Sequence, residues 1–397
     1  MNLKIRSQLS LMMFIEYFVW GSWYVTMGTY LTQTLKFDGV QVGVAYSALS
    51  IAAIISPFFV GMIADRFFAA ERALGVLHII GGILMYLISN VSTFDNFYPL
   101  LFAYTLCYMP TLALTNAVCF HQMNNPSQEF PNVRVFGTVG WIVAGLMLSF
   151  LKVEASVMQM TITAGLSFAM GIYSFTLPHT PPKKKGEKVT ISDVLGLEAL
   201  ALMKNPSFAI VVIASILICI PLSFYYNFTN LFLNELGMEN AAGKMTMGQA
   251  SEFFFLLVMP LFFVRLGVKK MIMFGMAAWA VRYLLFAFGN TESAIWMLYL
   301  GIVLHGICYD FFFVTGQIYV DNKAPEHLKS AAQGMITMAT YGIGMFVGSL
   351  ASGKVLDAYT IDATIPHDWQ SIWIVPAALA LMVLLLFAFF FKEEKQK

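Results

Sequence analysis

The stretch from Met247 to Arg265, MGQASEFFFLLVMPLFFVR, is almost wholly apolar, yet its sixth residue is a glutamate, Glu252. An α-helix needs about 20 mostly apolar residues to cross the hydrocarbon of a bilayer. A charged side chain at the centre of such a helix costs about 2.5–3.5 kcal/mol. The stretch therefore predicts a membrane-spanning helix. It also marks Glu252 as a residue kept for a partner, a water-filled cavity or a proton.

The whole chain has the composition of an integral membrane protein. Of its 397 residues, 59% are hydrophobic and 11% are charged, whereas a soluble chain carries roughly 25% charged residues. The net charge of +1 offers no basic surface, so we expect a lipid bilayer as surroundings and no nucleic-acid partner. The four cysteines lie in apolar stretches without metal-binding spacing. We expect no metal, no cofactor and no catalytic residues, and hence no enzyme.

Apolar runs and the polar joints between them define the predicted architecture, an all-α membrane protein with twelve transmembrane helices. A polar, basic segment at 178–205 divides them into an N-terminal six-helix half, 1–177, and a C-terminal six-helix half, 206–397. We expect this segment to be a cytoplasmic linker whose second part forms an amphipathic helix. The predicted spans are 8–35, 41–64, 73–91, 97–122, 132–153, 156–177, 207–234, 243–264, 270–289, 293–319, 328–356 and 370–391.

The positions of the basic residues predict the orientation. With a cytoplasmic N-terminus, the inner loops, tails and helix ends hold eighteen Lys and Arg and the outer ones hold four. Cytoplasmic loops are enriched in Lys and Arg. Both termini and the central linker are therefore expected to face the cytoplasm.

Short motifs along the chain resemble known transporters. Gly61, Asp65, Arg66 and Arg72 resemble the loop signature of the major facilitator superfamily, which implies a gating role for Asp65 and Arg66. Further motifs, in the right order and at similar spacing, resemble the nucleoside:proton symporter family. They include Trp20–Trp23, Tyr108–Leu112, Arg134–Trp141, Gln249–Glu252, Tyr309–Phe312 and Ser330–Met335.

The resemblance implies a function and a place in the cell. It implies a proton-coupled nucleoside importer of the bacterial inner membrane, with nucleoside and protons as its partners. Such a symporter works by alternating access, and its substrate is held between the two six-helix halves by spans 5, 7, 8 and 10. We expect a monomer to be sufficient for transport.

Two carboxyl groups within predicted spans, Glu252 and Asp310, are the candidates for proton coupling, because a buried carboxyl can gain and lose a proton as its cavity opens to each side. The alternative is a permanent salt bridge, for instance with Arg282 or Arg134, that locks the helices together. Glu16, in the first span, leaves two roles open, one structural and one as a second protonation or substrate site.

The candidate substrate-binding residues combine carboxylate, amide and hydroxyl groups with aromatic rings, which suits a ribose joined to a flat base. The resemblance implies five of them, and helical spacing adds the others. Trp141, Tyr226 and His305 differ from the residues expected at their positions in the family, and this leaves the base preference open. The candidates are Arg134, Thr138, Trp141, Tyr226, Asn227, Asn230, Gln249, Glu252, His305 and Tyr309.

Two other functions fit the composition: a carrier of another polar metabolite such as a sugar, and a membrane sensor that binds nucleoside without moving it. The predicted cytoplasmic loops are short for a signalling domain, and no ATP-binding loop of the G-x-x-x-x-G-K-[ST] kind occurs. The glycines of span 11, among them Gly334, Gly344, Gly348 and Gly353, predict close helix packing there.

Overall fold

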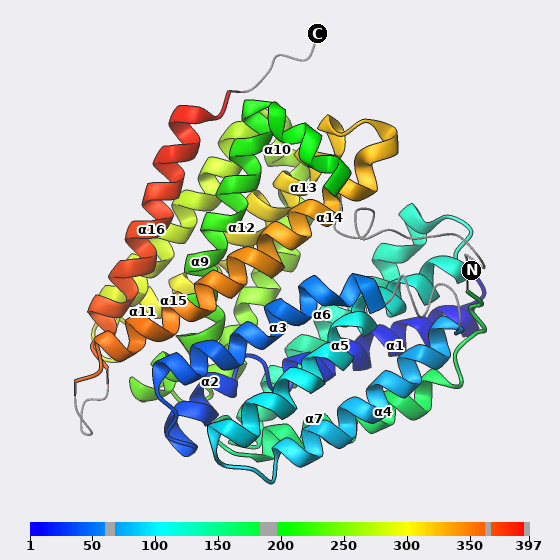
Figure 1. The fold of residues 1–397 in the computed structure, drawn as a ribbon. Helices are drawn as coiled ribbons and strands as arrows, with labels where there is room; N and C mark the ends of the chain where they lie inside the picture. The colour runs from blue at the N-terminus through cyan, green and yellow to red at the C-terminus, as the bar shows by residue number, and fades with distance from the viewer. Residues whose placement is uncertain (60–67, 183–196, 362–366, 393–397) are drawn as a thin grey trace. The chain divides into compact units, whose positions relative to one another are not determined.

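The computed structural model describes residues 1–59, 68–182, 197–361 and 367–392, and these residues are almost entirely helical (Figure 1). Within these ranges no strand occurs beyond one isolated bridge between Thr360 and His367. Nine helices in this part of the chain are long and apolar enough to cross a membrane. The predicted class, an all-helical protein with multiple membrane helices, is confirmed.

The chain forms two compact units. One comprises Met1–Phe37 and Ala48–Ile191, and is called here the N-terminal unit. The other comprises Asp38–Ser47 and Ser192–Lys397, and is called the C-terminal unit. The short segment Asp38–Ser47 thus packs with the second unit although it precedes most of the first in sequence.

Long helices packed in pairs build the N-terminal unit. Helix α1 packs against α6, and α4 packs against both α5 and α7 (Figure 1). The elements are α1 (Leu3–Gly21), α2 (Met27–Thr29), the π-helical turn η1 (Tyr30–Thr34), α3 (Gly39–Phe59), α4 (Ala70–Ile88), α5 (Phe94–Gln122), α6 (Pro126–Phe150) and α7 (Met158–Ser174). The first part of α3, up to Ser47, belongs to the C-terminal unit.

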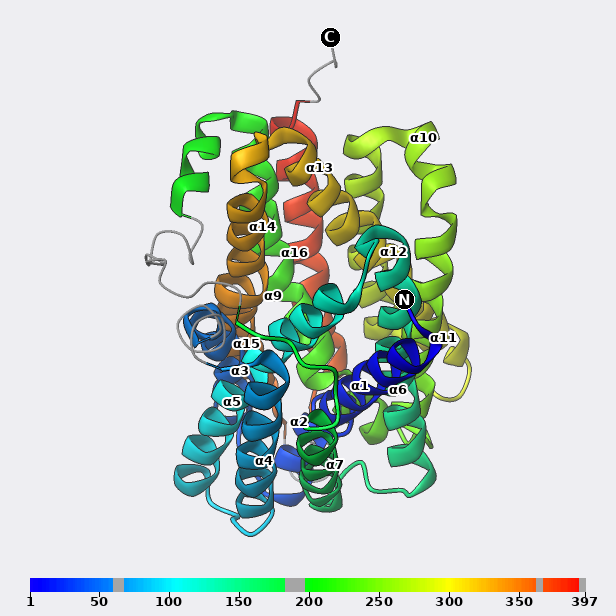
Figure 2. The same ribbon diagram turned by 90° about the vertical axis from the view of Figure 1, so that its right-hand side faces the viewer.

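The C-terminal unit has more broken helices. Helix α9 packs against α15 and α16, and α10 packs against α11, α12 and α16 (Figure 2). The elements are η3 (Leu197–Lys204), α9 (Pro206–Glu235), α10 (Ala241–Phe288), α11 (Ile295–Val303), α12 (His305–Tyr309), η4 (Asp310–Val314), α13 (Thr315–Lys323), η5 (Glu326–Leu328), α14 (Lys329–Thr337), η6 (Met338–Gly344), α15 (Met345–Ala358) and α16 (Trp369–Phe390).

Local sequence signals explain where several helices begin. Asn2 accepts a hydrogen bond from the Lys4 amide at the start of α1, and Asn205 accepts two from the first turn of α9. Asp368 accepts one from the Ser371 amide at the start of α16. These side chains satisfy backbone amides that a helix terminus otherwise leaves unpaired.

One predicted span differs from the helices that the structure shows, and one predicted joint between spans is a single residue. The span predicted at 8–35 is interrupted, because α1 ends at Gly21 and the chain turns before α2 begins at Met27. The spans predicted at 243–264 and 270–289 correspond to two helices that together carry the label α10 and that meet at one non-helical residue, Gly267, at φ 69°. A left-handed conformation is available to glycine without a steric penalty, so the break falls there.

The glycine-rich span lies where helices approach closely. A Cβ on Gly353 would lie 2.1 Å from the Gly39 carbonyl oxygen, and one on Gly348 would lie 2.4 Å from Ser223 Oγ. A Cβ on Gly344 would lie 2.7 Å from Cys219 Cβ. Close packing is thus confirmed at these three positions. The prediction of close packing is wrong at Gly334, where a Cβ would meet nothing within 4 Å.

Two predicted features, the gating residues and the central linker, fall partly or wholly outside the described residues. The candidate gating residues Asp65 and Arg66 lie in the segment 60–67, of which the structure describes nothing. Half of the predicted linker, 183–196, is also outside the description, and the end of the linker forms the 3₁₀ helix η3.

Candidate functional site

The N-terminal unit carries a cluster of aromatic rings around Trp141 of α6. The Trp141 ring lies edge-on to Trp20 of α1, with centroids 5.4 Å apart, and 6.3 Å from the ring of Tyr24. Trp20 also contacts Tyr108 of α5, at 5.9 Å. Trp141 and Trp20 are each only partly buried. They therefore present aromatic surface on which a flat base can stack.

Arg134 lies on the same side of α6 as Trp141. Arg134, Thr138 and Trp141 are spaced by four and three residues within one continuous helix, so they share a face. The guanidinium carbon of Arg134 lies 4.0 Å above the centre of the Tyr17 ring. This cation–π contact holds the guanidinium beside the aromatic cluster, where it can donate hydrogen bonds to polar groups of a ligand.

In the C-terminal unit, three ionisable side chains form a line from the core toward the surface. Arg282 of α10 is fully buried, and its NH1 lies 3.0 Å from Nδ1 of His305, which is itself fully buried. The other ring nitrogen, Nε2, lies 3.8 Å from Oε2 of Glu252. The Glu252 side chain is 31% exposed, so its carboxylate is the end of the line that solvent can reach.

The Arg282 contact determines which nitrogen of His305 carries a proton. A guanidinium has only donors, so Nδ1 must be the acceptor in this pair. A neutral His305 therefore carries its proton on Nε2, on the side of Glu252. Tyr225 supports the arrangement, because its ring lies 3.4 Å below the Arg282 guanidinium and stacks on His305 at 5.1 Å. Arg282 thus packs against His305 and Tyr225, and His305 lies between Arg282 and Glu252.

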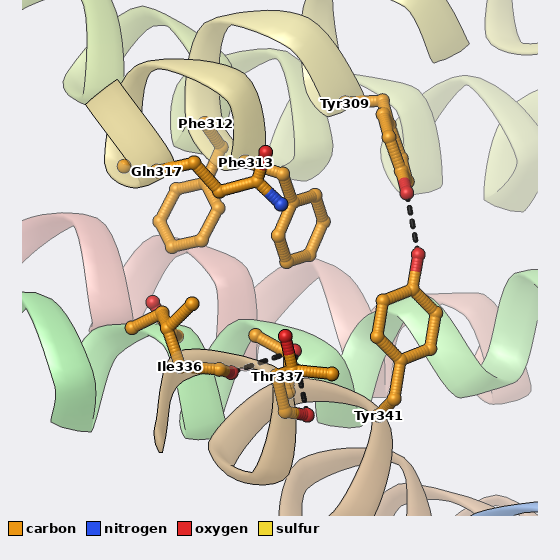
Figure 3. Close-up of a pocket in the computed structure, with 10 residues that line it drawn as sticks. Tyr309, Phe312, Phe313, Gln317, Ile336, Thr337 and Tyr341 are labelled. Atoms are coloured by element: carbon orange, nitrogen blue, oxygen red, sulfur yellow. Dashed lines mark hydrogen bonds between the residues drawn. The ribbon is translucent and has the colours of Figure 1, made fainter. Parts of the chain in front are cut away.

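A pocket lies beside this line, between two π-helical turns. Figure 3 shows Tyr309, at the end of α12, with its hydroxyl 2.5 Å from that of Tyr341 in η6. Phe312 and Phe313 of η4 and Gln317 of α13 line one side, and Ile336 and Thr337 of α14 line the other (Figure 3). Insertions of the π-helical kind often occur at functional sites. The pocket combines hydroxyl, amide and aromatic groups, which are the groups expected around a polar, flat ligand.

Asp310 is the first residue of the turn η4 and is almost fully buried, with 1% of the residue exposed. Among the described residues its Oδ2 atom has no hydrogen-bond partner. Burying a carboxylate with an unpaired oxygen is unfavourable, and a proton removes that charge.

The structure brings some of the predicted binding residues together and places others elsewhere. The Tyr226 ring lies 6.2 Å from that of His305, and the Tyr309 ring lies 5.8 Å from it on the other side. Gln249 lies on α10 one turn before Glu252, and it is partly buried.

The two candidate asparagines of α9, Asn227 and Asn230, are in a different environment. Asn227 is fully buried and donates a hydrogen bond to Ser352 Oγ of α15, at 3.1 Å. Asn230 is also fully buried and accepts hydrogen bonds from the Asn234 side chain. Both residues stabilise the packing around α9 in this structure, and a direct contact with substrate remains a prediction for them.

Four contacts at these sites were not expected from the sequence. Tyr341 faces Tyr309, Trp20 faces Trp141, Tyr225 lies beneath Arg282, and His78 pairs with Glu16. Each contact joins two helices that are distant in sequence, so helical spacing gives no signal for it. An isolated histidine in an otherwise apolar helix is the only hint that the sequence offers for His78.

The fold and these two sets of side chains define a helical membrane transporter. A family model described as nucleoside H+ symporter matches residues 1–396. The chain therefore belongs to the nucleoside H+ symporter family. This family comprises transporters, and the expectation that the chain is not an enzyme is confirmed.

Similar proteins cover nearly the whole chain. YegT of Escherichia coli strain K12 is 42% identical over 99% of this chain and 95% of its own. The nucleoside permease NupG of the same strain is 34% identical over 99% of this chain and 97% of its own. The xanthosine permease of that strain is 34% identical over 98% of this chain and 96% of its own.

Solved structures agree with the sequence relatives. A crystal structure of the nucleoside transporter NupG has a TM-score of 0.91 at 33% identity and covers 99% of this chain and all of that one. The POT family transporter PepTSo has a TM-score of 0.73 at 15% identity, over 98% of each chain, and shows a shared fold alone.

Proposed function

We propose that this protein is a proton-coupled nucleoside importer that works by alternating access. The observation that carries the proposal is the Arg282–His305–Glu252 line, which ends in a partly exposed carboxylate on an otherwise apolar helix. Membership of the nucleoside H+ symporter family and similarity to a nucleoside permease and a xanthosine permease support nucleoside as the substrate class.

The proposal gives each unit a part. Arg134, Thr138 and Trp141 form the candidate binding surface of the N-terminal unit, and Tyr226, Gln249, Glu252, His305 and Tyr309 form that of the C-terminal unit. Glu252 and Asp310 carry the proton, and Asp65 and Arg66 take part in gating. The full architecture has twelve membrane helices with both termini in the cytoplasm, and a monomer in the inner membrane is the transporting species.

Uptake into proteoliposomes tests the function directly. With about 100 mV across the membrane and one pH unit, a proton supplies about 3.7 kcal/mol, which supports accumulation of a neutral solute by roughly a few hundred-fold. We expect labelled uridine or adenosine to accumulate only when the imposed proton gradient is inward. Unlabelled nucleoside should compete, and free ribose should not.

The same assay separates the alternatives. Competition by ribose would indicate a carrier for sugars. Saturable binding without counterflow would indicate a sensor. Either result contradicts the proposed importer.

Replacing Trp141 tests the binding surface of the N-terminal unit. Stacking of a base on an aromatic side chain is worth about 1–3 kcal/mol, so Trp141→Ala should weaken nucleoside binding by roughly 10- to 100-fold. Trp141→Phe keeps an aromatic ring and should weaken it less. The measurement is the Kd for nucleoside by isothermal titration calorimetry in detergent.

Phe136→Ala is the matched control, because Phe136 lies on the opposite face of α6 and its ring is 41% exposed. This variant should bind nucleoside as the wild type does. If Trp141→Ala and Phe136→Ala have the same Kd as the wild type, the aromatic cluster does not contact the base.

A further inference from the structure

A second buried carboxyl group, Glu16 of α1, belongs to the N-terminal unit and lies outside the binding surface described above. Its side chain is fully buried, and Oε2 lies 2.8 Å from Nε2 of His78 in α4. His78 is itself buried, with 2% of its side chain exposed. The other carboxyl oxygen of Glu16, Oε1, lies 2.6 Å from the hydroxyl of Thr111 in α5. Three helices of the unit therefore meet at one carboxyl group.

The Glu16–His78 pair can hold one proton without a net charge. Either the carboxylate faces an imidazolium, or the neutral acid faces a neutral imidazole. A fully buried ion pair alone is weak evidence for stability, since both groups lose their hydration. The pair can bind and release a proton only if the neighbouring groups stabilise it both with the proton and without it.

The hydroxyl of Thr111 can stabilise the Glu16 carboxyl group in both states. Its hydroxyl oxygen lies 2.6 Å from Glu16 Oε1 and 2.5 Å from the main-chain oxygen of Tyr108. A hydroxyl has one proton to donate and two lone pairs that accept. When Glu16 is ionised, Thr111 donates to its carboxylate. When Oε1 carries a proton, the hydroxyl turns to the Tyr108 carbonyl and accepts from Glu16. Both states of the carboxyl group thus keep a hydrogen-bond partner.

The other charged and titratable groups around Glu16 come from α1, α5 and α6. Tyr17 and Tyr104 lie within electrostatic range of Glu16, and the Tyr108 hydroxyl donates to the Glu16 main-chain oxygen at 2.8 Å. Arg134 contributes a fixed positive charge behind the Tyr17 ring. A buried negative charge on the pair after loss of its proton is therefore partly compensated from α6.

The pair is also connected to the aromatic cluster. Glu16 precedes Trp20 by one turn of α1, and Tyr108 contacts both His78, at a ring distance of 6.0 Å, and Trp20, at 5.9 Å. Trp20 in turn packs on Trp141. A change in the proton count of the pair therefore acts on side chains that contact the candidate binding surface.

We propose that Glu16 and His78 form a second proton-binding site, which takes one proton from the aqueous phase and returns it during each transport cycle. Its part in transport rests on the proposed function, whereas the binding of the proton does not. Two experiments keep these apart.

Infrared difference spectroscopy of the purified protein, between acid and alkaline pH and without nucleoside, tests the site itself. The wild type should show a carboxylic acid C=O band of which Glu16→Gln removes one component. Thr111→Val keeps both titrating groups but removes the hydroxyl, and it should shift that component in frequency and midpoint pH.

Glu154→Gln is the matched control for the spectra. Glu154 is a buried glutamate of the same unit, 7% exposed, and it accepts a hydrogen bond from Ser149 rather than facing a histidine. This variant should keep the Glu16 component. If Glu16→Gln and Thr111→Val both leave the difference spectrum of the wild type unchanged, the pair is a static ion pair and the proposal is overturned.

The proton-to-nucleoside ratio, from the reversal potential of uptake into proteoliposomes, tests the role in transport. Glu16→Gln and His78→Gln should each lower this ratio by one while nucleoside exchange at fixed pH stays within about two-fold of the wild type. An unchanged ratio together with an unchanged pH profile of exchange contradicts the role. If the wild type moves no nucleoside, the proposed function fails, and the infrared spectra still decide whether the site binds a proton.

Discussion

Glu252→Gln should lower the accumulation of nucleoside against its gradient by roughly a few hundred-fold while leaving nucleoside exchange in place. The amide has the shape of the carboxylate and can still accept and donate hydrogen bonds, so substrate binding survives. It cannot take up and release a proton, so the proton that Glu252 carries no longer drives transport. The accumulation ratio should fall by the factor that one proton supports, roughly a few hundred-fold, which is a loss of about 3.7 kcal/mol in coupled driving force.

The measurement compares uptake driven by a proton gradient with counterflow in the same proteoliposomes. Glu292→Gln is the control, since Glu292 is an exposed residue of the same unit in the turn between α10 and α11. Accumulation by Glu252→Gln at the level of the wild type would show that another group carries the proton, and Asp310→Asn would then be the variant to test. Loss of both accumulation and exchange would instead show that Glu252 is needed to bind the nucleoside.

The class of fold follows from the sequence because each membrane helix has its own solvent requirement. A segment such as Met247–Arg265 is too apolar for water, and in lipid it must satisfy its backbone hydrogen bonds internally, so a helix is the only solution. This argument needs no information about neighbouring segments. It gives the approximate extent of each helix, as the agreement between the predicted span 207–234 and α9, Pro206–Glu235, shows.

The breaks within the helices do not follow in the same way. The basic joint with Lys269 and Lys270 does mark a break between two helices, but the sequence does not show that a single residue, Gly267, makes this break. Lys269 follows the break, and its ammonium group donates hydrogen bonds to the main-chain oxygens of Ala388 and Phe391. The π-helical turns η4 and η6 are also absent from the sequence pattern, since one extra residue in a turn leaves the apolar character of the span unchanged.

The candidate site was predictable only in part, for a related reason. Helical spacing places Gln249 and Glu252 on one face, and it places Arg134, Thr138 and Trp141 on another. It says nothing about which residue of a distant helix lies opposite. His305 therefore appears in the sequence as one polar residue among several, and only the structure shows that it stands between Arg282 and Glu252.

Gly353→Ala should destabilise the protein, although alanine is the better helix former. The start of α3 lies directly on α15, where the Asp357 carboxylate accepts hydrogen bonds from the amides of Gly39 and Val40, at 2.5 Å and 2.8 Å. A Cβ on Gly353 would stand 2.1 Å from the Gly39 carbonyl oxygen, and both groups are backbone. The helices must therefore separate, and overpacking of this kind costs about 1–3 kcal/mol or more.

Gly334→Ala makes the same chemical change where there is open space, because a Cβ on Gly334 meets nothing within 4 Å. Here the intrinsic preference of helices for alanine is unopposed, so this variant should be neutral or stabilised by up to about 1 kcal/mol. Gly353→Ala is thus expected to lower the apparent melting temperature in detergent, whereas Gly334→Ala should leave it unchanged or raise it. A Gly353→Ala protein that melts no lower than Gly334→Ala would mean that α3 does not begin on α15. In that case Asp357→Ala, which removes both acceptors, should also leave the melting temperature unchanged.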